Sequence, residues 1–187
     1  GVDYVVAPSG SCAAMIRVHY PRLFKDDPLS MAAAEELAER TYELTSFLSD
    51  VMQWSAINAE YAGRVSYQDG CAGLRELAIR DQPRKLLALV RGLELVEGID
   101  AGNCCGFGGL FSITYPDISA RIADAKTDDI GATGAELVLG GDLGCLIHLA
   151  GRETAVPCRH VAEVLAGMTA DAPPIGETNE KKNARQR

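Results

Sequence analysis

The segment Val138-Leu-Gly-Gly-Asp-Leu-Gly-Cys145 runs from apolar residues through a glycine-rich turn to a cysteine. The apolar start is typical of a buried strand, and a helix is expected to follow the turn. The segment Val5-Val-Ala-Pro-Ser-Gly-Ser-Cys12 has the same order of strand, four linking residues and a cysteine that opens a helix. The two segments are either an internal repeat or a chance match of short length. A true repeat would make residues 64–168 one complete unit and residues 1–20 the end of an earlier one.

Strand and helix patterns alternate along most of the chain. Strands are expected where β-branched and apolar residues run between turn residues, and helices where apolar residues recur at helical spacing. This alternation predicts an α/β fold with a mainly parallel sheet flanked by helices. The expected strands are residues 2–7, 64–68, 93–96, 137–139 and 155–156, and the expected helices are residues 12–19, 29–51, 71–79, 83–90, 116–130, 145–150 and 160–168.

The composition is that of a globular chain that does not bind nucleic acid. The 187 residues are 47% apolar and 24% charged, which suits one domain or two small domains that share a core. The formal net charge of −8 repels phosphate backbones, so a general role in nucleic-acid binding is excluded. No apolar run approaches the ~20 residues that a membrane-spanning helix needs, so the sequence predicts a soluble protein.

The two ends of the chain differ in character. The chain starts at Gly1 and enters an expected strand directly, without an initiator methionine or a targeting segment. We therefore expect it to be the C-terminal part of a longer protein. From Asp171 onward the composition is rich in proline and then charged, which is typical of a disordered tail.

Cysteine is the unusual feature of this composition, because the chain has six cysteines and only three histidines. Cys71 and Cys145 each follow an expected strand, at the carboxyl edge of the sheet, where α/β proteins place their sites. Cys104 and Cys105 lie in the glycine-rich segment 102–109, whose glycines permit the tight turn that lets both thiols face one ligand. Soft thiolates gathered without histidine favour an iron–sulfur cluster or zinc.

Other roles for these residues stay open at this point. A disulfide framework is possible for an even number of cysteines, although an α/β chain of this size does not need one. Structural zinc sites usually contain C-x-x-C pairs, which this sequence lacks. Cys158 is expected to be a buried cysteine without a ligand role. His148, one helical turn after Cys145, either donates a hydrogen bond to a cofactor sulfur or packs against its neighbours. His19 and His160 are expected to have core or surface roles.

Four segments together resemble the cysteine-rich CCG family of iron–sulfur oxidoreductases. They are Val6-Ala-Pro-Ser-Gly-Ser-Cys12, Asp69-Gly-Cys71 with Gln82-Pro-Arg84 downstream, Asn103-Cys-Cys-Gly-Phe-Gly-Gly109, and Gly141-Asp-Leu-Gly-Cys145-Leu-Ile-His148. The resemblance extends from Gly1 to about Met168 and is strongest with the iron–sulfur subunits of complexes that oxidise L-lactate. It implies a cytoplasmic oxidoreductase subunit that passes electrons through a cluster and works with the other subunits of such a complex.

The resemblance also implies two CCG repeats, each of which gathers cysteines around a cluster. Residues 1–60 would be the end of the first repeat with a long connecting helix, residues 61–170 the second repeat, and residues 171–187 a disordered tail. Cys12 would bind the cofactor as the last ligand of the first repeat. The second repeat would hold a [4Fe–4S] cluster, with the metal ligands Cys71, Cys104, Cys105 and Cys145.

The sequence departs from the family pattern at several positions. Repeats of the heterodisulfide reductase type end in Cys-x-x-Cys, but here the earlier position is Ser9 in one repeat and Asp142 in the other. Four thiolates remain in the second repeat, enough for an ordinary [4Fe–4S] cluster, so a thiol–disulfide reductase function is in doubt. A histidine that often follows the first cysteine is replaced by Ala72. A structural zinc or scaffold domain in a multiprotein assembly is the alternative function from a different class.

Overall fold

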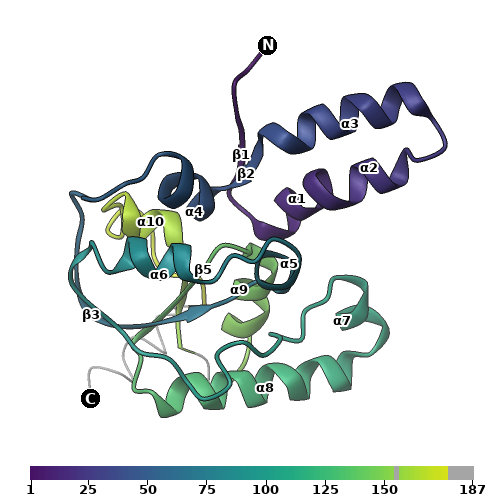
Figure 1. Cartoon of the computed structure of the whole chain (residues 1–187). Helices are drawn as coiled ribbons and strands as arrows, with labels where there is room; N and C mark the ends of the chain where they lie inside the picture. Colours follow the sequence, from purple (N-terminus) through teal and green to yellow (C-terminus); the bar gives the residue numbers. More distant parts are fainter. Residues whose placement is uncertain (154–155, 177–187) are drawn as a thin grey trace.

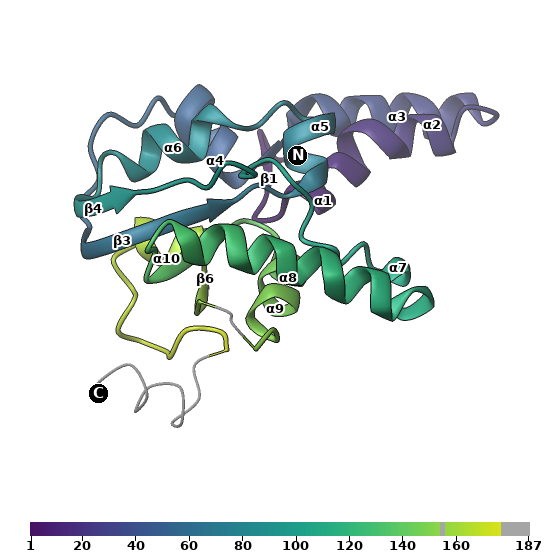
Figure 2. The same cartoon turned by 90° about the horizontal axis from the view of Figure 1, so that it is seen from below.

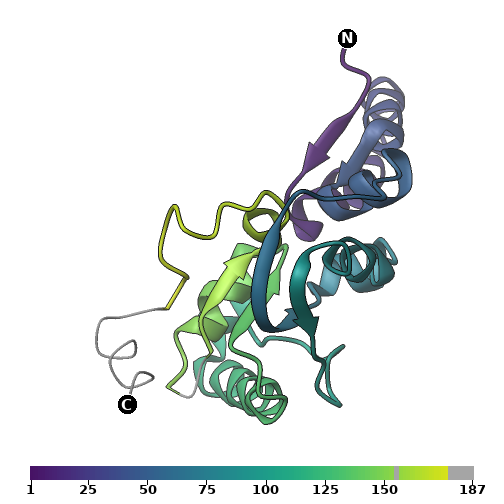
Figure 3. The same cartoon turned by 90° about the vertical axis from the view of Figure 1, so that its left-hand side faces the viewer.

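The computed structural model describes residues 1–153 and 156–176, and it has an α/β fold. The main sheet has four strands in the order β4-β3-β5-β6, and every pair of neighbours is parallel. Figure 3 shows these strands side by side, with the N-terminal part of the chain at one end of the sheet. The fold class predicted from the sequence is confirmed. The strands are β3 (Glu60–Gln68), β4 (Arg91–Leu95), β5 (Leu137–Gly140) and β6 (Cys158–His160).

The two central strands bury apolar side chains, β5 on both faces of the sheet and β3 on the face that carries Val65 and Tyr67. On one face, Val65 lies opposite Leu137 in the β3–β5 register and packs against α6 (Asp81–Leu87) and α10 (Val161–Leu165). On the other face, Val138 packs against α8 (Pro116–Ala132) and α9 (Leu143–Ala150). Helices therefore cover both faces of the sheet, as Figures 1 and 2 show.

A smaller parallel pair of strands forms the N-terminal unit. β1 (Val5–Ala7) pairs with β2 (Thr41–Glu43), and a helical hairpin connects them and projects away from the main sheet (Figure 1). Asp27 caps the second arm by accepting the N–H groups of Leu29 and Ser30, and Pro28 occupies the first helical position. The arms are α1 (Gly10–Ala14), the π-helical turn η1 (Met15–His19) and α2 (Tyr20–Leu23), followed by α3 (Pro28–Arg40).

The long helix expected at residues 29–51 is wrong in its second half. Strand β2 interrupts it at Thr41, and two short helices follow, α4 (Leu44–Ser46) and the π-helical turn η2 (Phe47–Val51). The leucine spacing that suggested one helix is real, but a β-branched and an aromatic residue, Thr41 and Tyr42, suit a strand. Pairing with β1 gives these residues the backbone hydrogen bonds that a continued helix would otherwise supply. This tertiary contact overrides the local helical pattern.

Two further differences concern the C-terminal part. The strand expected at residues 155–156 is instead β6, which starts at Cys158, and residue 155 lies outside the described residues. Residues 171–176, where the tail was expected to begin, lie against the sheet. Ile175 and Cys158 exchange backbone hydrogen bonds of 3.0 and 2.8 Å, and Arg159 donates to the carbonyl oxygens of Thr169 and Ala172. The rest of the expected tail, residues 177–187, lies outside the described part of the chain.

The carboxyl ends of the strands all reach the same side of the molecule. There α5 (Cys71–Glu76) follows β3 directly and packs across α1, so closely that a Cβ added at Gly10 would lie 3.0 Å from the backbone of Gly73. A short helix, α7 (Leu110–Thr114), leads from the glycine-rich segment into α8. Among the described residues, no helix combines the length and apolar composition that a membrane crossing requires.

Candidate metal centre

Cys71 is held at the end of the central strand β3. It is the first residue of α5, and Gly70 in extended conformation precedes it as the N-cap. A Cβ at Gly70 would lie 2.0 Å from Oδ2 of Asp142, so only glycine leaves room for that carboxylate. The Cys71 side chain is half-buried. Because β3 lies in the middle of a parallel sheet, the position of this thiol is fixed by the core.

Cys104 and Cys105 lie in a tight turn that glycine makes possible. Gly106 has a φ of +84°, and a Cβ there would lie 2.5 Å from the carbonyl oxygen of Ser119 in α8. The Ser119 hydroxyl donates to the carbonyl of Gly106 at 2.8 Å and ties the turn to that helix. The backbone N–H of Gly106 in turn points at the Cys104 sulfur, 3.3 Å away, where it stabilises negative charge.

Cys145 faces this turn from the first turn of α9. Its sulfur lies 2.8 Å from the sulfur of Cys105, which is buried. The Phe107 ring packs onto the backbone of Gly144, where a Cβ would lie 2.5 Å from the ring. Small residues beside the two cysteines therefore let the turn and the helix approach each other closely.

The cysteines line one cavity of about 1000 Å³ at the carboxyl side of the sheet. The cavity brings together residues that are more than 130 positions apart in the sequence. Cys12, at the third position of α1, lies on its wall and is exposed to solvent. All the cysteines for which the sequence predicted a ligand role reach this one space, namely Cys12, Cys71, Cys104, Cys105 and Cys145.

The thiols affect one another's protonation. The hydrogen bond with Cys145 lowers the pKa of Cys105 to about 7, against the opposing effect of burial. The same hydrogen bond and burial raise the pKa of Cys145 far above that of an ordinary thiol. Burial, together with the hydrogen bond to Cys104, raises the pKa of Cys71 to about 11. A metal binds thiolates, so loading this site would release protons from these groups.

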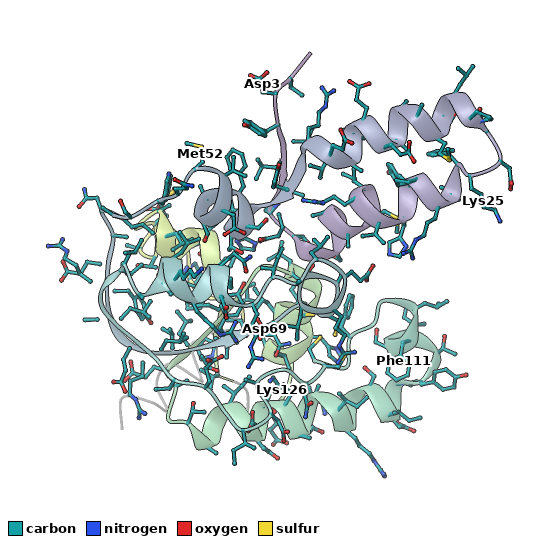
Figure 4. All side chains as sticks on the ribbon, viewed as in Figure 1. Asp3, Lys25, Met52, Asp69, Phe111 and Lys126 are labelled. Carbon is teal, nitrogen blue, oxygen red and sulfur yellow. The ribbon has the colours of Figure 1, made fainter. Side chains whose placement is uncertain are left out.

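Two cationic side chains anchor the backbone that carries the cysteines. Arg84 binds the Asp69 carboxylate with both terminal nitrogens, at 3.0 and 2.8 Å, and also contacts Glu97 in the segment that leads to the Cys104–Cys105 turn. Lys126 is buried and donates from α8 to the carbonyl oxygens of residues 100 and 101 of that segment, at 2.7 and 2.9 Å. Figure 4 labels Asp69, which directly follows β3, and Lys126, which lies on α8.

Sequence reasoning missed the residues that join the N-terminal unit to this site. His160 was assigned no such role, but it caps α10 with Nδ1 accepting the N–H of Ala162. Nε2 therefore carries the ring proton, and it lies 3.0 Å from the carbonyl oxygens of both Pro8 and Gly141. The spacing of His160 and Glu163 matches the capping box that these residues form, but the contact with Pro8 has no signal in the sequence.

The other cysteine and histidine residues contact neighbouring groups of the protein and do not line the cavity. His148 packs against the Phe107 ring, and its Nε2 lies 3.1 Å from the Ser119 hydroxyl, so it supports the glycine-rich turn. Cys158 is fully buried in the core on the α8–α9 side of the sheet, as expected. His19 forms an exposed pair with Glu76 at 2.7 Å. None of the six cysteines, all of which lie in the described residues, forms a disulfide.

The donor set fits a cofactor that binds through several sulfurs. In residues 1–153 and 156–176, no three histidine, cysteine, aspartate or glutamate side chains are placed to bind a single metal ion. A cofactor with several metal atoms, each bound by its own cysteine, does not require the thiols to meet at one point. Four thiols around a roomy cavity and a backbone N–H aimed at one sulfur provide the donors for such a cluster, and the sulfurs of Cys105 and Cys145, 2.8 Å apart, would separate to bind different iron atoms.

Comparison with known proteins agrees with this geometry. Residues 65–150, which contain Cys71, Cys104, Cys105 and Cys145, match the CCG family, described as a cysteine-rich domain. The fold and the site thus define a cysteine-rich CCG domain protein.

Longer matches identify the family more closely. Lactate utilization protein A of Geobacillus kaustophilus is 46% identical in an alignment of 167 residues, which covers 87% of this chain and 70% of that protein. The proteins of the same name from Exiguobacterium sp. and Bacillus subtilis are each 42% identical over 167 residues, 68% and 70% of their respective lengths. The chain belongs to the lactate utilization protein A family.

Proposed function

We propose that this chain is an iron–sulfur electron-transfer subunit of a complex that oxidises L-lactate. In this proposal a [4Fe–4S] cluster is bound by Cys71, Cys104, Cys105 and Cys145. The observation that carries the proposal is the convergence of these thiols, from the ends of β3 and β5 and from one turn, on a single cavity. The proposal that the substrate is L-lactate rests on the name of the relatives, with which this chain shares 42–46% identity.

The chain's own residues bind the cluster and shape its surroundings. When bound, a [4Fe–4S] cluster supplies one-electron transfer, and the protein sets its potential and exposure. The Gly106 N–H stabilises charge on the Cys104 sulfur, and burial of Cys105 keeps water from part of the site. The open side of the cavity leaves a route by which electrons reach the other subunits of the complex.

Four thiolates, and not five, are available to the CCG repeat of residues 65–150. Repeats of the heterodisulfide reductase type would have a further cysteine at residue 142, where this chain has aspartate. The Asp142 carboxylate is occupied by hydrogen bonds with Ser9 and Ser11. This arrangement favours an ordinary electron-transfer cluster over disulfide-cleaving chemistry.

Anaerobic reconstitution with iron and sulfide tests the cluster assignment. The expected result is about four iron atoms per chain, a broad visible absorption and an electron paramagnetic resonance signal on reduction. Cys104→Ser should lose most of the iron and the signal. Cys158→Ser is the matched control, because Cys158 is buried in the core and does not line the cavity, and it should keep both. One zinc per chain without iron, or a Cys104→Ser protein with unchanged spectra, would contradict the assignment.

A growth experiment tests the lactate part separately. A bacterium that lacks its own lactate utilization protein A would be complemented with the complete gene for this protein, unchanged or with Cys71→Ser. Growth on L-lactate should return with the unchanged gene and fail with Cys71→Ser, while growth on glucose is the same for both. Equal growth on L-lactate with the Cys71→Ser gene would count against the proposed role.

A further inference from the structure

Three loops, which follow β1, β3 and β5, meet around the side chain of Asp142. Oδ1 of Asp142 accepts hydrogen bonds from the Ser9 hydroxyl, from the Ser11 hydroxyl at 2.6 Å and from the Ser11 backbone N–H at 3.2 Å. Oδ2 lies beside Gly70 and Gly10. A Cβ added at Gly70 or Gly10 would lie 2.0 or 3.3 Å from it, so both glycines leave space for this oxygen. One carboxylate therefore contacts all three loops.

Each of these loops leads into a helix that carries a cavity cysteine. Gly70 directly precedes Cys71 at the start of α5. Asp142 is the N-cap of α9 and precedes Cys145 by three residues, and Ser9 is the N-cap of α1 and precedes Cys12 by the same number. The two N-caps thus contact each other across the junction between the N-terminal unit and the main sheet.

Other contacts of the junction also hold α1, whose Ala13 and Ala14 are buried. The Nε2–H group of His160 lies between the carbonyl oxygens of Pro8 and Gly141, and α1 crosses α5 at Gly10. These contacts involve backbone before and at the start of α1. Asp142 binds the residue immediately before Cys12, because it accepts both the hydroxyl and the backbone N–H of Ser11, whose hydroxyl also lies 2.9 Å from that of Ser9.

We propose that Asp142 is a positioning residue that binds the first turn of α1 and thereby holds the Cys12 thiol on the wall of the four-cysteine cavity. The inference goes beyond the proposed function, which assigns Asp142 no task and does not require Cys12. It concerns the chain without a cofactor, so it can fail while the cluster assignment stands, and the reverse also holds.

Thiol cross-linking on the cofactor-free full chain tests this proposal. A short bifunctional maleimide would be added under reducing-agent-free anaerobic conditions, and peptides joining Cys12 to Cys71 or Cys145 would be measured by mass spectrometry. Asp142→Ala should lower the yield of these cross-links several-fold. Asp142→Asn should keep it near the wild-type yield, because all three hydrogen bonds go to Oδ1, which asparagine retains.

Asp27→Ala is the matched control. Asp27 is also an N-cap aspartate that accepts two backbone N–H groups and a serine hydroxyl, but it caps α3 and does not line the cavity. Its loss should leave the Cys12 cross-links unchanged. The double variant Ser9→Ala/Ser11→Ala removes both hydroxyl donors and keeps the carboxylate, which leaves only the longer bond from the backbone N–H of residue 11, so it should also lower the yield even if Asp142→Ala does not fold. Wild-type yields in both Asp142→Ala and the double variant, or no such cross-link in the wild type, would overturn the proposal.

Discussion

Arg84 binds the carboxylate of Asp69 with both terminal nitrogens, and the two side chains are 15% and 3% exposed. Asp69 lies two residues before Cys71. The guanidinium also lies over the Tyr67 ring, 5.5 Å from its centre, and binds Glu97 on the way to the Cys104–Cys105 turn. This one side chain therefore fixes two of the segments that carry cavity cysteines.

Arg84→Met should destabilise the protein strongly, because it leaves the Asp69 carboxylate buried without a partner. We expect a loss of about 3–5 kcal/mol in the free energy of unfolding, measured by urea denaturation. Arg91→Met removes the exposed pair with Glu60, whose side chains are 71% and 65% exposed, and should cost less than about 1 kcal/mol. Similar losses in the two variants would show that the buried Arg84–Asp69 pair stabilises the protein no more than the exposed Arg91–Glu60 pair.

Gly106→Ala should displace the turn that carries Cys104 and Cys105. The new Cβ would clash with the Ser119 carbonyl oxygen, from which it would lie only 2.5 Å away. A residue with a Cβ also loses roughly 1–2 kcal/mol at the positive φ of this position. We expect lower iron content after reconstitution. Gly134→Ala is the control, since Gly134 also has a positive φ but its nearest neighbour is the flexible end of Arg64. Its iron content should stay at the wild-type level, and equal iron content in both variants would refute the steric argument.

Glu43 makes the stability of the protein depend on pH. Burial raises the pKa of this carboxyl above its ordinary value of 4.5, although hydrogen bonds from Thr45 and Ser46 oppose the effect. A raised folded-state pKa gives a contribution that is complete at low pH and is lost as the pH rises through that pKa. Glu43→Gln should therefore gain stability relative to the wild type as the pH increases from 4 to 8.

Urea denaturation at several pH values measures this difference. Glu39→Gln, on the exposed part of α3, is the control, and its stability relative to the wild type should stay constant over the same range. A constant difference for Glu43→Gln as well would mean that burial of Glu43 does not affect the ionisation of its carboxyl.

Asp142→Asn should raise the midpoint potential of the reconstituted cluster. It removes one negative charge at the start of the helix that carries Cys145, and a site with less negative charge is reduced more easily. Redox titration followed by electron paramagnetic resonance gives the potential. Asp27→Asn makes the same charge change at an N-cap that does not line the cavity and should leave the potential unchanged. A lower or unchanged potential in Asp142→Asn would contradict this expectation.

The sequence was sufficient for β3, β4 and β5 of the main sheet and for the placement of most cysteines. Buried strands of a parallel sheet end on one side, so Cys71 and Cys145, which follow β3 and β5, were expected together, and the structure places both on one cavity. Their role as metal ligands stays a prediction. The glycines around Cys104 and Cys105 likewise indicated the tight turn that Gly106 makes.

The contacts between distant segments could not be predicted in this way. The apolar residues before and after β2 recur at helical spacing. The pairing of β2 with β1, more than thirty residues away in the sequence, makes this segment a strand. Asp142 was noted as a replacement for cysteine, but its hydrogen bonds with Ser9 and Ser11 depend on how the N-terminal unit packs on the sheet. Local patterns contain no information about that packing.

The backbone pairing of Ile175 with Cys158 has a consequence for self-association. The N–H and carbonyl of Cys158 point away from β5, and Ile175 pairs with both of them. Strand β6 is the outermost strand of the sheet, and an outermost strand with unpaired backbone groups is a template on which a second molecule can add its own strand. By occupying these groups, Ile175 shields that flank, and a chain cut after residue 170 would be more prone to aggregate.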